Sequence, residues 1–116
     1  MRLKWILIGI LISAAASAQM LIKPSGATFM DNMAIAMKRM DKDMAAAPMT
    51  GDVDHVFAQM MIPHHQGAID MAKSELLYGK DPVMRRLAQE ILADQQSEID
   101  AMDLWLKKTP VPKSEN

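Results

Sequence analysis

The chain of 116 residues contains no cysteine, and aromatic residues make up only 4% of it. Without cysteine there can be no disulfide framework, no thiolate metal site and no cysteine nucleophile. Methionine, by contrast, occurs 13 times, so that thioether side chains supply much of the apolar volume. Methionine is flexible and polarisable, and we expect an adaptable core that is held by packing alone or with help from metal or oligomerisation.

Basic charge is not in excess either, because 13 Lys and Arg stand against 14 Asp and Glu. Nucleic-acid-binding domains usually present a basic face, so we expect no nucleic-acid partner. Motifs of the common enzyme classes are missing as well. There is no His-Glu-x-x-His, no pair of Glu-x-x-His motifs and no glycine-rich phosphate loop. We therefore predict that the protein is not an enzyme. An enzyme with a metal-bound water is a weaker alternative.

The N-terminus has the form of a secretion signal. Arg2 and Lys4 precede an apolar run over residues 5–12, and a small-residue stretch ends at Ala18 in a cleavage site of the A-x-A type. The apolar run is shorter than the roughly 20 residues of a membrane span, which argues against the alternative of a membrane anchor. We predict that residues 1–18 are a cleaved signal peptide and that the mature protein is periplasmic or secreted, without a stable membrane anchor.

The remaining sequence predicts helices and no strand. Residues 19–27 contain Pro, Ser and Gly and are typical of a linker. A helical bundle domain is expected over residues 28–108, with helices at about 29–47, 53–78 and 83–107, followed by a flexible tail at 109–116. Each helix begins after a good N-cap residue, and these caps are Thr28, Asp52 and Asp81.

The first predicted helix carries a stripe of methionines at alternating spacings of three and four residues: Met30, Met33, Met37, Met40 and Met44. Such a stripe is more often core packing than a set of metal ligands. The three helices are similar in length and can lie antiparallel through short loops. The fold class is therefore all-α, an antiparallel helical bundle, with room for a fourth helical partner. A homodimer is one way to complete it.

The second predicted helix contains all three histidines of the chain, together with Pro63, which should kink it. Residues four apart lie on one helical face, and the motif offers several thioether and imidazole pairs of this kind. Imidazole and thioether together suit Cu(I), while imidazole also suits Cu(II) and zinc. The candidate metal ligands are His64, His65, Met60, Met61, Asp54, Met71 and His55.

The sequence supports these candidate ligands to different degrees. Asp54 could supply a hard oxygen to Cu(II) or orient an imidazole. His55, near the start of the helix, is more simply explained as a surface residue. The adjacent His64 and His65, flanked by Met60 and Met61, leave a metal role and a structural role about equally open.

The run from Asp54 to Ala72, with Met60-Met61 and His64-His65-Gln66, resembles a known signature. It is similar to the secreted bacterial family known as domain of unknown function 305, which includes copper-binding proteins of the CopM type. A second run, from Ile91 to Leu106 with Gln95, Glu98, Met102 and Trp105, resembles the last helix of that family.

The resemblance implies a ferritin-like helical bundle, export to the periplasm or beyond, and copper binding in at least some members. Carried over by motif, His64, His65, Met60, Met61 and Asp54 are the implied ligands, whereas a hydrogen-bond network between helices is implied for Gln66, Gln95 and Glu98.

Two functions remain open at this point. The first is a periplasmic or secreted protein that sequesters or transfers copper, most simply Cu(I), and exchanges it with a copper transporter or chaperone. Other soft or borderline metal ions fit the same ligands. The second is a metal-independent helical interaction module, in which the methionines form an adaptable groove for a partner.

Overall fold

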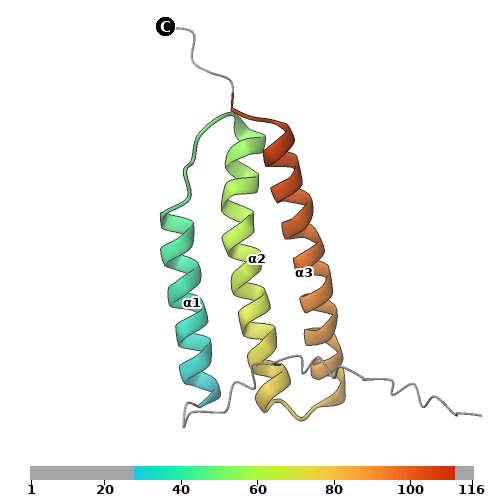
Figure 1. Ribbon diagram of the computed structural model, residues 1–116. Coiled ribbons are helices and arrows are strands. Elements are labelled where there is room, and N and C mark those ends of the chain that lie inside the picture. Colours follow the sequence, from blue (N-terminus) through green and yellow to red (C-terminus); the bar gives the residue numbers. More distant parts are fainter. Residues whose placement is uncertain (1–27, 112–116) are drawn as a thin grey trace, which may run out of the picture.

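The computed structural model describes residues 28–111, and it consists of three antiparallel α-helices (Figure 1). They are α1 (Phe29–Ala45), α2 (Val53–Tyr78) and α3 (Pro82–Lys108). The all-α prediction is confirmed, and no strand occurs in the described range. The predicted signal peptide, the linker and the last residues of the predicted tail lie outside the described residues. None of the three helices is long and apolar enough to cross a membrane.

Side-chain caps explain where the helices begin. Thr28 and Asp31 form a reciprocal capping box at the start of α1. The Asp52 carboxylate accepts the backbone N–H of His55, and the Asp81 carboxylate accepts two backbone N–H groups at the start of α3. Pro63 lies inside α2, which continues through it as one helix. Helix α1 ends two residues before the predicted Ala47, since the residue before Pro48 is disfavoured in helical conformation.

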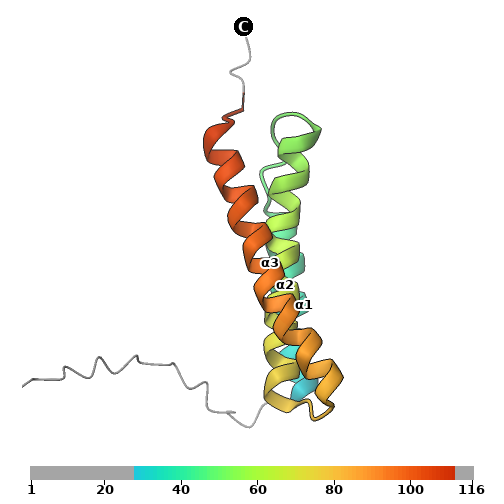
Figure 2. The same ribbon diagram turned by 90° about the vertical axis from the view of Figure 1, so that its right-hand side faces the viewer.

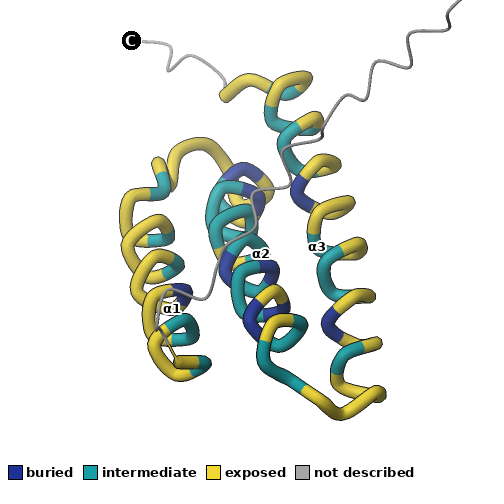
Figure 3. Tube along the Cα trace, turned by 60° about the horizontal axis from the view of Figure 1, so that its bottom comes forward, coloured by how far each residue is buried: buried dark blue, intermediate teal, exposed yellow. Residues whose placement is uncertain are grey.

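The helices form a single layer with α2 in the middle (Figures 1 and 2). Helix α2 packs against both neighbours, whereas the backbones of α1 and α3 make no close contact in the described part of the chain and share only the lining of a hollow over α2. Buried positions accordingly lie along α2 and on the sides of α1 and α3 that face it (Figure 3). The three helices therefore enclose no central core, and both broad faces of the layer stay open.

Contacts at the end of the layer where α1 begins and α2 ends fix the two helix pairs. There, the Phe29 ring packs edge-on against Tyr78, with ring centroids 6.2 Å apart, and the Asn32 side chain donates to the Tyr78 hydroxyl. In the α2–α3 turn, the Arg85 guanidinium donates to the carbonyls of Leu76 and Gly79, which closes the C-terminus of α2. Each neighbouring pair of helices is thus held both along its length and at its end.

The two faces of the layer differ in chemistry. With 3.6 residues per turn, Phe57, Met61, His64, Ala68, Met71 and Glu75 lie along one side of α2. We call this side the open face; Met84, Leu87 and Met102 of α3 line hollows on it with the α2 residues. On the opposite side, a more polar hollow between α1 and α2 includes Arg39, Asp70 and Lys73.

The methionine stripe of α1 is only partly buried. Met33, Met40 and Met44 are half-buried, whereas Met30 and Met37 are exposed. The predicted core role therefore holds for only part of the stripe, because α1 has a neighbour on one side alone.

Candidate metal site

The candidate site is a hollow on the open face between the middle of α2 and α3. Its volume is about 360 Å³, and it is lined by Phe57, Met61, His65, Glu98, Ala101 and Met102. Met61 and His65 are four residues apart on α2, and Glu98 and Met102 are four apart on α3. Two such pairs on facing helices bring two thioethers, one imidazole and one carboxylate around a single hollow.

His65 is the most informative side chain in this hollow. Its Nε2 is hydrogen-bonded to the Glu98 carboxylate across the two helices. Since a carboxylate accepts, Nε2 carries the proton, and in the neutral imidazole Nδ1 is left with the lone pair. Nδ1 is buried and has no hydrogen-bond partner among the described residues. A histidine whose second nitrogen is held by a carboxylate is the usual arrangement of a metal-ligating imidazole.

His64 differs from its neighbour in exposure. It points away from α2 toward solvent, and the two ring centroids are 6.1 Å apart. His64 does not line the hollow that contains His65. The adjacent pair therefore provides one imidazole inside the hollow and one at the surface beside it.

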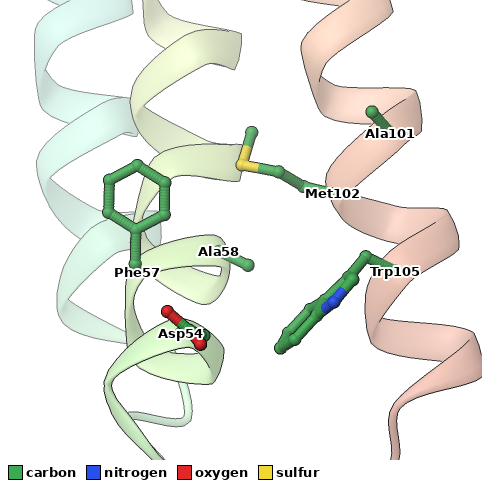
Figure 4. Close-up of a pocket in the computed structure, with 6 residues that line it drawn as sticks. All are labelled: Asp54, Phe57, Ala58, Ala101, Met102 and Trp105. Atoms are coloured by element: carbon green, nitrogen blue, oxygen red, sulfur yellow. The ribbon is translucent and has the colours of Figure 1, made fainter.

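The other predicted ligands lie elsewhere. Asp54 lines the adjoining hollow with Phe57, Met102 and Trp105, and Figure 4 shows Met102 and Trp105 extending from α3 toward α2. Met71 lines a third hollow that includes Glu75. Met60 is half-buried and does not line the hollow of His65. The structure thus brings together only Met61 and His65 from the predicted set.

His55 is not the surface residue that the sequence suggested, because only 2% of it is exposed. Its Nδ1 lies 2.8 Å from the Asp52 carboxylate, and its Nε2 lies 2.7 Å from the carbonyl oxygen of Thr109. The ring also packs against Trp105, with centroids 4.8 Å apart. Both nitrogens are engaged with acceptors, so His55 has no free lone pair for a metal ion.

The two hydrogen bonds favour the protonated imidazole of His55. The bond to the Asp52 carboxylate, followed by the bond to the Thr109 carbonyl, raises the pKa of His55 above its ordinary value of 6.5, against the effect of burial. The same bond from His55 lowers the pKa of Asp52. This cluster is a structural clamp that ties the start of α2 to the end of α3, and it includes the first residue of the predicted tail.

Glu98 and Met102 are the site residues that the sequence analysis did not select. Glu98 was considered for a network between helices together with Gln66 and Gln95. The structure confirms a cross-helix bond for Glu98, whereas the Gln66 amide donates to Asp70 on its own helix. The spacing of Glu98 and Met102, which repeats that of Met61 and His65, is the signal that could have identified them.

No three His, Asp or Glu side chains among residues 28–111 converge in a way that could hold a metal ion. The two thioethers beside His65, from Met61 and Met102, are therefore the side chains of this hollow that could complete a metal site. Thioethers are soft ligands, which favours Cu(I) over hard cations such as magnesium and calcium.

A comparison with protein families matches residues 10–106 to the family described as domain of unknown function DUF305. The chain belongs to this family. The match covers α1, α2, all but the last two residues of α3 and the whole of the candidate site. An uncharacterized protein of Acanthamoeba polyphaga mimivirus is 42% identical over 50 residues, which are 43% of this chain and 33% of the viral protein. The chain thus matches about a third of the length of that relative.

Proposed function

We propose that this DUF305 protein is an exported copper-binding protein, which sequesters or transfers copper and contributes to copper homeostasis or tolerance. The observation that carries the proposal is the buried, unpartnered Nδ1 of His65, a residue that lines a hollow together with Met61 and Met102. Imidazole and thioether are ligands that Cu(I) accepts, and the cross-helix bond to Glu98 orients the imidazole. In this proposal copper is the cargo of a binding protein, not the cofactor of an enzyme.

The exposed imidazole of His64 extends this proposal to metal exchange. It lies next to His65 but outside the hollow, where an incoming ion or an acceptor protein can reach it. Exchange with a copper transporter or chaperone in the periplasm would use this position while the open face of that copy is uncovered.

The test is an anaerobic Cu(I) titration of the mature protein against a calibrated chelator. We expect His65→Ala and Met61→Leu to lose affinity. Met30→Leu is the matched control, because Met30 is 71% exposed on α1 and leucine preserves its apolar character. If His65→Ala competes for copper as well as the wild type does, the proposed site is wrong.

A second candidate function is favoured by the open face itself. Phe57 is 62% exposed there, beside hollows that are mostly apolar. Methionine-rich surfaces of this kind adapt to partner helices, so a metal-independent interaction module would use the same face. A wild-type protein that fails to compete with the chelator for Cu(I) would favour this function.

A further inference from the structure

The open face leaves large apolar side chains in contact with solvent. Phe57, Met84 and Leu87 are 62%, 47% and 45% exposed, and they line neighbouring hollows on one side of the layer. The opposite side includes an ion pair between Arg39 and Asp70, with nitrogen and oxygen 3.4 Å apart. The opposite side also exposes Ile35 and Leu77, but there they lie among charged side chains, whereas no lysine or arginine lines the hollows of the open face. The open face is therefore the side that a partner is expected to cover.

The interior of a single copy is also small. Its buried apolar residues are four alanines and two isoleucines, and no side chain in the described range is completely buried. Small domains without disulfides need a further source of stability, and oligomerisation is one of the common sources. The missing apolar core is therefore expected on the open face, where the large side chains already lie.

We propose that the open face is the interface between two copies of this chain, which pack α2 against α2. Helix α2 has 26 residues and is thus about 39 Å long at 1.5 Å per residue. Three helices at a spacing of about 9 Å make a layer about 25 Å wide, which gives a face of roughly 1,000 Å². A stable interface needs about 800 Å² from each partner, so the open face is large enough.

The charges on the open face fit a second copy better than an acidic partner or an anionic membrane. The residues that line its three hollows include Asp54, Glu75 and Glu98 but no lysine or arginine. Asp54 and Glu75 lie toward opposite ends of α2, and Glu98 is already bonded to His65. Two copies would therefore meet through apolar side chains at the centre, with the unpaired carboxylates near the ends.

The position of His64 fixes what lies at the centre of this interface. His64 lies near the middle of α2 and on the same side as Phe57 and Ala68. When two such layers overlap fully, the midpoints of the two α2 helices meet, whether the helices run parallel or antiparallel. The exposed His64 of one copy then lies close to His64 of the second copy, and each adds an imidazole beside the candidate metal site of the other.

Sedimentation of the mature protein in the presence of a metal chelator tests the dimer. We expect the wild type to sediment as a dimer and Phe57→Glu as a monomer, because the new carboxylate would be buried in the interface. Ile35→Glu is the matched control, since Ile35 is 58% exposed on α1 beside the polar hollow. A monomeric wild type, or equal effects of the two substitutions, would overturn the inference.

A cysteine cross-link tests the geometry independently of stability. The chain has no cysteine of its own, so a single introduced thiol reports on one position alone. Under mild oxidation His64→Cys should form a disulfide-linked dimer, whereas Lys73→Cys on the polar face should stay monomeric. Failure of His64→Cys to cross-link, or equal cross-linking of both variants, would refute the α2–α2 packing. Neither experiment involves copper, so a failure of the proposed copper binding would leave their outcome unchanged.

Discussion

Gly67 is the position at which the packing of α1 on α2 can be tested most sharply. It is buried on α2, and a Cβ atom added there would lie 2.5 Å from Sδ, 2.8 Å from Cγ and 2.9 Å from Cβ of Met40. The sulfur and Cγ can rotate away, but the Cβ of Met40 is fixed to the backbone of α1. Substitution of Gly67 by alanine should therefore push the two helices slightly apart, because a new Met40 rotamer relieves the contacts with Sδ and Cγ but not the contact with Cβ.

Two opposing terms determine the size of the effect. Alanine in a helix interior is favoured over glycine by about 1 kcal/mol, whereas overpacking typically costs about 1–3 kcal/mol. We expect Gly67→Ala to lower the free energy of unfolding by up to about 2 kcal/mol, because the cost of overpacking exceeds the gain in helix propensity. In a Met40→Ala background only the contact between the two Cβ atoms remains. The same substitution should then still lower the free energy of unfolding, but by less, because the contacts with Sδ and Cγ are gone while the two Cβ atoms remain too close.

Urea denaturation of the four proteins in this double-mutant cycle measures the coupling between the two positions. We expect a coupling of about 1–2 kcal/mol, which lies within the range for residues in direct contact. If Gly67→Ala stabilises the wild type by the full propensity gain, or acts equally in both backgrounds, the close approach of α1 to α2 at Met40 is not as described.

Three further predictions concern the clamp, the carboxylate of the site and a helix cap. The pKa of His55 is raised in the folded protein, so its contribution to stability should be complete below about pH 6.5 and lost as the pH rises through the folded pKa. Thermal unfolding at pH 5.5 and at pH 8.5 should show this loss. His55→Gln should remove the part of the difference that is due to His55. Glu98→Gln should weaken copper binding about 10- to 100-fold in the chelator titration, whereas Glu90→Gln on the exposed side of α3 should not. Thr28→Ala should lower the free energy of unfolding by about 1 kcal/mol in urea, since it removes the capping box of α1; no change would contradict the observed cap.

The helices could be predicted closely because their determinants are local. The cap residues Thr28, Asp52 and Asp81 lie next to the segments that they start, and each acts within its own first turn. The predicted end of α1 at Ala47 was wrong for an equally local reason, because the residue before Pro48 disfavours helical conformation.

The arrangement of the helices and the partners of the histidines could not be predicted in the same way. Periodicity tells which side of a helix is apolar, but not which other helix covers that side. The sequence therefore did not reveal that α1 and α3 stay apart. His55 was placed on the surface because its second partner, the carbonyl of Thr109, lies 54 residues further along the chain. Glu98 and His65 are 33 residues apart, and only the packing of α3 on α2 brings them together.

The arrangement of α1, α2 and α3 in chain order has a kinetic consequence. Only helices that follow one another in the chain make close backbone contact in the described range, so each pairing can start at the connecting turn and extend along the two helices. Chains with such low contact order generally fold within microseconds to milliseconds. A polypeptide without cysteine also has no oxidation step to wait for. The protein should therefore reach its helical layer soon after the chain is released, before it encounters a second copy or a metal ion.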